Sequence, residues 1–158
     1  MPTTFTCLHF RDLSLEQLHA LFQLRVDVFV VEQTCPYTEI DGKDPDAWHL
    51  LGQDTNGALV CYARVLPEHD AEAPHIGRVV VRKEARGTGL ADELMHQCFG
   101  LLERLYGSRR NDIAAQAYLE RFYQRHGYRT TSKPYDWDGI PHIDMVHDGQ
   151  GRDINAPA

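Results

Sequence analysis

The stretch with the clearest chemical meaning is VVVRKEARGTGLADELM, residues 79–95, in which Arg86, Gly87 and Gly89 separate a β-branched run from a helix-like pattern. A turn from a strand into a helix gathers unpaired backbone N–H groups at the positive end of the helix dipole, and such a turn binds anions. Side chains in place of the two glycines would keep phosphate oxygens away from the backbone, and a tight turn favours positive φ there. The pattern therefore predicts a phosphate-binding turn to which Arg86 adds positive charge.

Two common phosphate-binding motifs do not fit this turn. A P-loop requires GxxxxGK[ST], and no Lys-Ser or Lys-Thr follows at that spacing. A dinucleotide fingerprint requires a third small residue where Asp92 stands, and a parallel βαβ start. Hydrolysis of a nucleoside triphosphate and binding of a dinucleotide are therefore not expected.

The residues from Arg86 to Ala91 spell R-x-x-G-x-A, which resembles the acetyl-CoA signature of the GNAT superfamily of N-acetyltransferases. A second stretch, AYLERFYQRHGY at residues 117–128, looks like the late helix of that family. Further segments resemble its ElaA-like branch: LRVDVFVVEQTCPYTEIDGKD, HIGRVVV and DGIPHIDM. The resemblance thus covers nearly the whole chain.

This resemblance implies an α/β fold with a mixed, mostly antiparallel twisted sheet, flanked by helices and splayed between residues 79–81 and 112–117. Acetyl-CoA would lie in the splay as the co-substrate, its pantetheine arm pairing with the backbone of the Val79 strand and its pyrophosphate held by the turn. The implied cofactor-binding residues are Val79, Val80, Val81, Arg86, Gly87, Thr88, Gly89, Leu90, Ala91 and Tyr123.

Transfer of acetyl to an amine needs a neutral amine, donors for the oxyanion and a proton for the departing thiolate. Tyr123 matches the tyrosine of the family's late helix and can protonate the sulfur, because a phenol of pKa about 10 suits a thiol of about 8.5. As a core aromatic beside Phe122, Tyr123 would have only a packing role. The leading candidates for the general base are Glu32 and His142, and the remaining candidates are Glu39, Glu68 and His75.

The elements that must position these residues follow from hydrophobic spacing and turn signals. Ser14 and Gln17 form a capping box ahead of a first helix, and a β-branched run at 26–31 leads into a long Pro/Asp/Gly-bearing loop. Asn56-Gly57 predicts a hairpin. The remaining predicted strands and helices are strands 48–53, 58–66 and 76–82, a helix from 90 to 105, a strand 112–117, a helix 118–126, and a final strand pair 128–131 and 140–146.

Length and composition set the outer limits. With 158 residues, 42% hydrophobic and 25% charged, the chain predicts one globular domain over residues 1–148 and a flexible tail over 149–158. The N-terminus lacks a signal-peptide pattern, so a cytoplasmic protein with its four cysteines reduced is expected. The net charge of -7 disfavours binding to nucleic acid, and no stretch is long and apolar enough to cross a bilayer. The sequence contains neither an HExxH nor a CxxC motif, so a metal site is not expected.

The resulting hypothesis is a cytoplasmic acetyl-CoA-dependent acyltransferase that acts on a small-molecule or peptide amine. The alternative is a non-catalytic acyl-CoA-binding sensor or interaction module. Four acids, Glu32, Glu39, Asp41 and Asp44, lie in or beside the long loop and predict a funnel that attracts cationic amines. The sequence leaves open the acceptor, the general base and the oligomeric state, for which a homodimer paired through edge strands is one option.

Overall fold

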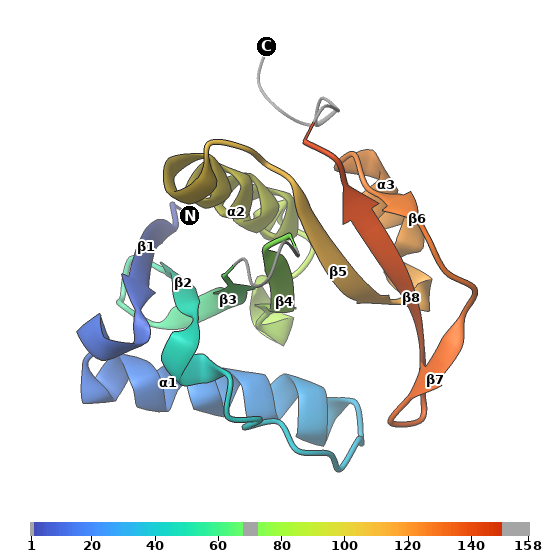
Figure 1. Ribbon diagram of the computed structural model, residues 1–158. Helices are drawn as coiled ribbons and strands as arrows, with labels where there is room; N and C mark the ends of the chain where they lie inside the picture. Colours follow the sequence, from blue (N-terminus) through green and yellow to red (C-terminus); the bar gives the residue numbers. More distant parts are fainter. Residues whose placement is uncertain (1, 68–72, 150–158) are drawn as a thin grey trace.

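The computed structural model describes residues 2–67 and 73–149. Its eight-stranded sheet has the order β1-β2-β3-β4-β5-β8-β6, and β7 pairs with β8 (Figure 1). All pairs are antiparallel except β4 with β5. The strands are β1 (Thr4–His9), β2 (Trp48–Gln53), β3 (Leu59–Leu66), β4 (His75–Val81), β5 (Asn111–Gln116), β6 (Arg129–Thr130), β7 (Tyr135–Trp137) and β8 (Ile140–His147). The mixed, mostly antiparallel sheet is as predicted.

Two helices cover opposite faces of the sheet in Figure 1. One is α1 (Leu15–Arg25), which begins with the predicted capping box between Ser14 and Gln17, and the other is α2 (Leu90–Tyr106). A short helix, α3 (Glu120–Arg125), lies before β6. Short 3-10 segments join the elements at Phe10–Asp12, Asp44–Asp46, Lys83–Ala85 and Ala117–Leu119.

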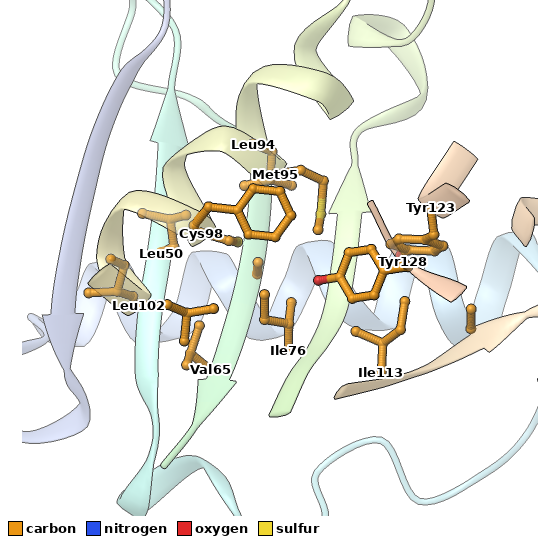
Figure 2. Close-up of a cluster of buried hydrophobic side chains, with 14 of the residues drawn as sticks. Leu50, Val65, Ile76, Leu94, Met95, Cys98, Leu102, Ile113, Tyr123 and Tyr128 are labelled. Carbon is orange, nitrogen blue, oxygen red and sulfur yellow. The ribbon is translucent and has the colours of Figure 1, made fainter. Parts of the chain in front are cut away.

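The buried core has two parts, one for each face of the sheet. Adjacent residues of a strand alternate between them, so that Leu50 and Cys61 join the part under α2 while Leu51 and Tyr62 join the part over α1. Figure 2 shows the first part, in which side chains of α2 meet those of the strands, and in which Tyr123 and Tyr128 lie next to each other. The two layers of packing fix the sheet between the helices.

Several local predictions need correction. The β-branched run after α1 does not leave the helix but continues as a π-helical segment, η2 (Val26–Glu32), because Val28 and Phe29 pack into the core over α1. The strands β1 and β7 were not predicted, since β7 has only three residues and β1 has no strong hydrophobic alternation. The predicted tail and the candidate base Glu68 fall on residues outside the described ranges, except for Gly149.

Among the described residues, no helix combines the length and the apolar character required to cross a membrane.

Candidate functional site

The sheet opens between β4 and β5. The two strands pair at a single position, His75 with Asp112, where the His75 Nδ1 lies 2.6 Å from the Asp112 carboxylate. Beyond that point, among the described residues, β5 pairs only with β8. Likewise β4 pairs only with β3, across a register shift near Arg78. Arg78 has φ of 52°, an uncommon value for a residue with a side chain. The splay therefore leaves backbone N–H and C=O groups of β4 facing an open space.

A cavity of about 750 Å³ fills this splay. Its walls come from η2 and the following loop, from β4 and β5, and from the α3 and β7–β8 regions. The candidate catalytic residues Glu32, Tyr123 and His142 all line it, although they lie far apart in the sequence. The tertiary structure thus brings the three together around one space.

A smaller cavity of about 210 Å³ lies at the predicted phosphate turn. Gly87 and Gly89 both have positive φ, 76° and 81°, and a Cβ on either would meet no other protein atom within 4 Å. Gly89 caps α2, whose first-turn N–H groups point out of the helix end as in any helix. The two cavities adjoin, and together they are called the channel below. Four residues line both: Val81, Arg86, Ala91 and Phe122.

Arg86 is held in place at this junction. Its Nε donates to the Val81 carbonyl at 3.0 Å, and its Nη1 and Nη2 donate to the two carboxylate oxygens of Glu32 at 2.9 and 3.1 Å. This bidentate pair ties η2 to the turn. Arg125 also lines the smaller cavity, where its Nη2 lies 3.6 Å from the carboxylate of Asp92, another lining residue.

Comparisons with known proteins agree over most of the chain. A family model described as an acetyltransferase (GNAT) domain matches residues 13–148. The protein ElaA of Escherichia coli is 43% identical over 144 residues, which are 89% of this chain and 94% of that protein. The chain belongs to the GNAT acetyltransferase family. It is therefore an acyltransferase that depends on an acyl-CoA.

Solved structures of GNAT relatives have the same fold. The crystal structure of an acyl-CoA N-acyltransferase from Pseudomonas aeruginosa has a TM-score of 0.87 and 42% identity, covering 92% of this chain and 99% of that one. The crystal structure of Escherichia coli ElaA has a TM-score of 0.88 and 41% identity over 93% and 100% of the two chains. The expected GNAT architecture, splayed between β4 and β5, is confirmed.

The residues predicted to hold the cofactor nearly all border the GNAT channel. The three valines and Tyr123 line the large cavity, and the turn residues line the small one, with Arg86 and Ala91 at both. Thr88 is the exception, because its side-chain hydroxyl donates to the Ala85 carbonyl at 2.8 Å and it lines neither cavity. A role for Thr88 would fall to its backbone N–H, and the cofactor contacts as a set stay predictions.

Tyr123 is buried on α3 and also borders the large cavity. Its ring packs edge-on against Phe122 and Tyr128, at centroid distances of 5.0 and 5.6 Å. Burial raises the pKa of Tyr123 above its usual value of 10, so the phenol keeps its proton at neutral pH. The packing role and the proton-donor role are therefore compatible at this position.

The two leading base candidates have different environments. The His142 Nδ1 lies 2.7 Å from the Ile140 carbonyl, which can only accept, so Nδ1 carries the proton and Nε2 is left as an acceptor. The ring lies between those of Tyr135 and Trp137. Glu32, in contrast, has both oxygens engaged by Arg86. Of the two, only His142 has a proton acceptor that no described residue occupies.

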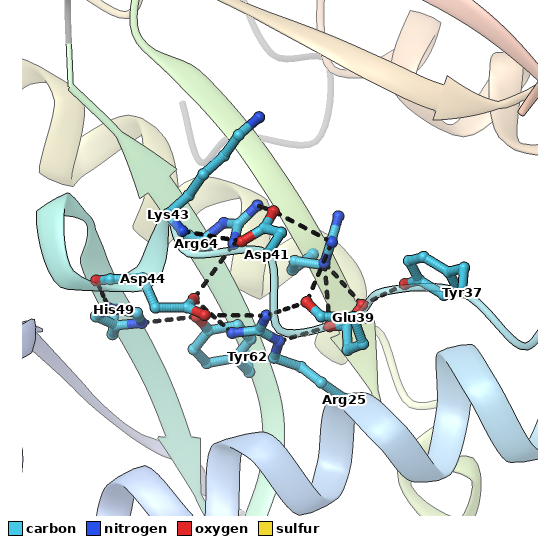
Figure 3. Close-up of polar contacts among 10 residues, drawn as sticks. Arg25, Tyr37, Glu39, Asp41, Lys43, Asp44, His49, Tyr62 and Arg64 are labelled. Atoms are coloured by element: carbon cyan, nitrogen blue, oxygen red, sulfur yellow. Dashed lines mark hydrogen bonds and ion pairs between the residues drawn. The ribbon is translucent and has the colours of Figure 1, made fainter.

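The predicted acidic funnel is wrong. Glu39 and Asp44 are buried, and together with Asp41 they are paired with arginines in the cluster of Figure 3. Glu32 is paired with Arg86. Burial raises the pKa of Asp41, but hydrogen bonds from Arg64 and the Lys43 backbone outweigh it and lower this pKa to about 2. The four acids do not form an open acidic surface for an incoming ammonium group.

Sequence reasoning missed the three cations of this cluster, Arg25, Arg64 and Arg78. A signal was present, because Arg25 falls on the apolar face of α1 and Arg64 lies within an apolar strand, and buried arginines are almost always paired. The sequence did not show which acids pair with these arginines. Within the described ranges, no group of three or more His, Cys, Asp or Glu side chains is arranged to hold a metal ion, and the four cysteines are free thiols.

Proposed function

We propose that this chain transfers an acetyl group from acetyl-CoA directly to the amine of a small-molecule or peptide acceptor. The observation that carries the proposal is that the cavity at the glycine turn adjoins the cavity in the splay, which has Tyr123 and His142 on its walls. A pyrophosphate at the turn and a pantetheine arm along β4 would deliver the thioester into the large cavity. The same channel leaves room for an acceptor from the loop side.

In the proposed reaction the neutral amine nitrogen attacks the thioester carbonyl carbon and forms a tetrahedral oxyanion. Backbone N–H groups of β4 freed by the splay would stabilise that oxyanion. The carbon–sulfur bond then breaks, the Tyr123 hydroxyl gives its proton to the thiolate, and the proton lost by the amine passes to a base. The products are an N-acetylated amide and free CoA.

His142 is the base that the geometry favours, since its Nε2 is the acceptor left by the Nδ1 contact with Ile140. His142→Asn should lower kcat while CoA affinity is retained. Glu32→Gln should act differently, because it releases Arg86 at the turn and therefore changes CoA affinity. If Glu32→Gln instead lowers kcat with CoA affinity retained and His142→Asn leaves kcat unchanged, Glu32 is the base.

The deciding experiment is a screen of acetyl-CoA consumption over amines, amino acids and peptides, with release of the CoA thiol as the signal. An acceptor whose turnover is lost in Tyr123→Phe supports an acetyltransferase. The sensor hypothesis predicts tight CoA binding without turnover for any acceptor. Faster release of CoA from another acyl-CoA than from acetyl-CoA would correct the donor but keep the reaction class.

A further inference from the structure

The charged cluster beside the large cavity has no unused carboxylate oxygen. It comprises Arg25, Glu39, Asp41, Asp44, Arg64 and Arg78 (Figure 3). Arg25 donates to Glu39 at 2.6 Å and to Asp44 at 2.6 and 3.3 Å. Both oxygens of Asp41 accept from Arg64 at 2.9 Å, and the second oxygen of Glu39 accepts from Tyr37 and lies 2.9 Å from Arg78 Nε.

Donors, in contrast, are left over on the cavity side. Arg78 uses Nε and Nη2 on Glu39 and Asp41, and its Nη1 has no acceptor among residues 2–67 and 73–149. The Lys43 ammonium group is exposed and also has no acceptor within those ranges. Figure 3 shows its side chain extending away from the paired carboxylates. Both residues line the large cavity.

The charge balance points the same way. Three arginines meet three carboxylates in the cluster, so Lys43 adds a positive charge that no acid of the cluster compensates. Asp138 also lines the large cavity but is not a member of the cluster. An ammonium group that entered the cluster would have to displace an arginine from a carboxylate, which leaves a buried charge without a partner. An incoming anion would instead receive two cationic donors without breaking any existing pair.

The backbone at Arg78 provides a separate observation. Its φ of 52° lies in the left-handed region, within a strand and at a register shift. Such strain in a residue with a Cβ persists where the surrounding structure holds it, and it is concentrated at functional sites. Arg78 directly precedes Val79, the first valine of the expected pantetheine wall. An anion held at Arg78 would thus lie next to the end of the channel where the thioester is expected.

We propose that the acceptor is an amine that also carries an anionic group, a carboxylate or a phosphate, bound by Lys43 and Arg78. This inference rests on the proposed function and replaces the cationic acceptor expected from the sequence. The anion fixes one end of the acceptor and leaves its amine directed toward the thioester. Selectivity then depends on a substituent that takes no part in the reaction.

Matched pairs of acceptors test the proposal. β-Alanine has a carboxylate that β-alaninamide lacks, and phosphoethanolamine has a phosphate that ethanolamine lacks. The first pair therefore tests for recognition of a carboxylate, and the second pair tests for recognition of a phosphate. In the wild type, kcat/KM should be at least tenfold higher for the member that carries the anionic group than for its partner without that group. Lys43→Gln should remove most of that preference by raising KM. Lys133→Gln, an exposed lysine outside the cavity, should keep it.

A second measurement does not depend on turnover. Calorimetry on the CoA-loaded protein compares N-acetyl-β-alanine with its amide, and N-acetylphosphoethanolamine with N-acetylethanolamine. Tighter binding of the anionic member, lost in Lys43→Gln and kept in Lys133→Gln, supports the anion site. This holds even if no amine is acetylated, and in that case only the proposed function fails. The anion site is overturned if the members without an anionic group bind and turn over equally well or better. It is also overturned if Lys43→Gln affects both members of a pair equally.

Discussion

Replacement of Tyr123 by phenylalanine removes one hydroxyl and keeps the ring that packs against Phe122 and Tyr128. The burial that raises the pKa of Tyr123 keeps the phenol protonated at neutral pH, so wild-type enzyme always has the donor. Loss of one general acid lowers kcat by about 10²–10⁴, which corresponds to about 2.7–5.4 kcal/mol in the barrier. CoA affinity should change little, because a proton transfer to sulfur occurs only during the reaction.

The assay is steady-state release of CoA thiol, with CoA affinity measured by calorimetry on the same preparation. The loss in kcat should be constant from about pH 6 to 9, since the raised pKa places ionisation of the wild-type phenol above that window. A pH-dependent loss at neutral pH would point to a group other than this phenol.

Tyr128→Phe is the matched control. Tyr128 is also a buried tyrosine of the same core, but its hydroxyl donates to the Asn111 side chain at 2.6 Å and it does not line either cavity. Its loss leaves a buried acceptor unsatisfied and should lower the free energy of unfolding by about 1–3 kcal/mol, with kcat unchanged. An unchanged kcat in Tyr123→Phe, or an equal loss in both variants, would refute the assignment of Tyr123 as the acid.

Three further predictions concern the turn, the buried charges and the thiols. Gly89→Val should weaken CoA binding by about 1–3 kcal/mol in calorimetry, because a φ of 81° is strained for valine and its side chain would project into the open space at the turn. Gly57→Val is the control, because Gly57 has a φ of 80° in the β2–β3 hairpin. This variant should lose stability but keep its CoA affinity. Arg25→Leu should lower the free energy of unfolding by about 3–5 kcal/mol in urea titrations, because it leaves buried carboxylates without their partner. Arg109→Leu, at a more exposed ion pair, should cost roughly 1 kcal/mol. A loss for Arg25→Leu as small as that of Arg109→Leu would contradict the prediction. Cys61, whose pKa burial raises to about 12, should react with iodoacetamide at pH 8 only after unfolding, and rapid labelling of the folded protein would show that the thiol is accessible.

The sequence was most informative where a few neighbouring residues decide the structure. The capping box of α1, the Asn56-Gly57 hairpin and the glycine turn before α2 were all predicted, because each depends on contacts or dihedral angles within about four residues. The resemblance of the same turn to the GNAT signature then gave the family and the sheet. Thus the glycine turn at one end of the channel could be located from the chain alone.

Local propensity failed where packing decided the outcome. The β-branched run at 26–31 favours a strand, yet it continues α1 as η2 since Val28 and Phe29 are needed in the core. This helical extension carries Glu32 to Arg86, 54 positions away, and so determines that Glu32 has a partner. The sequence offered Glu32 as a base and Arg86 as a phosphate ligand without any sign that they meet.

The net charge of the cavity wall formed by the loop after η2 was decided only by the tertiary structure. Four acids in or near one loop look like an acidic surface when they are read in sequence, but the arginines that neutralise three of them come from α1, β3 and β4. Their separations along the chain run from 14 to 39 positions, and no local pattern encodes such pairings. The electrostatic field at a site depends on distances in space, so the sign of a surface cannot be read from the charges of one segment.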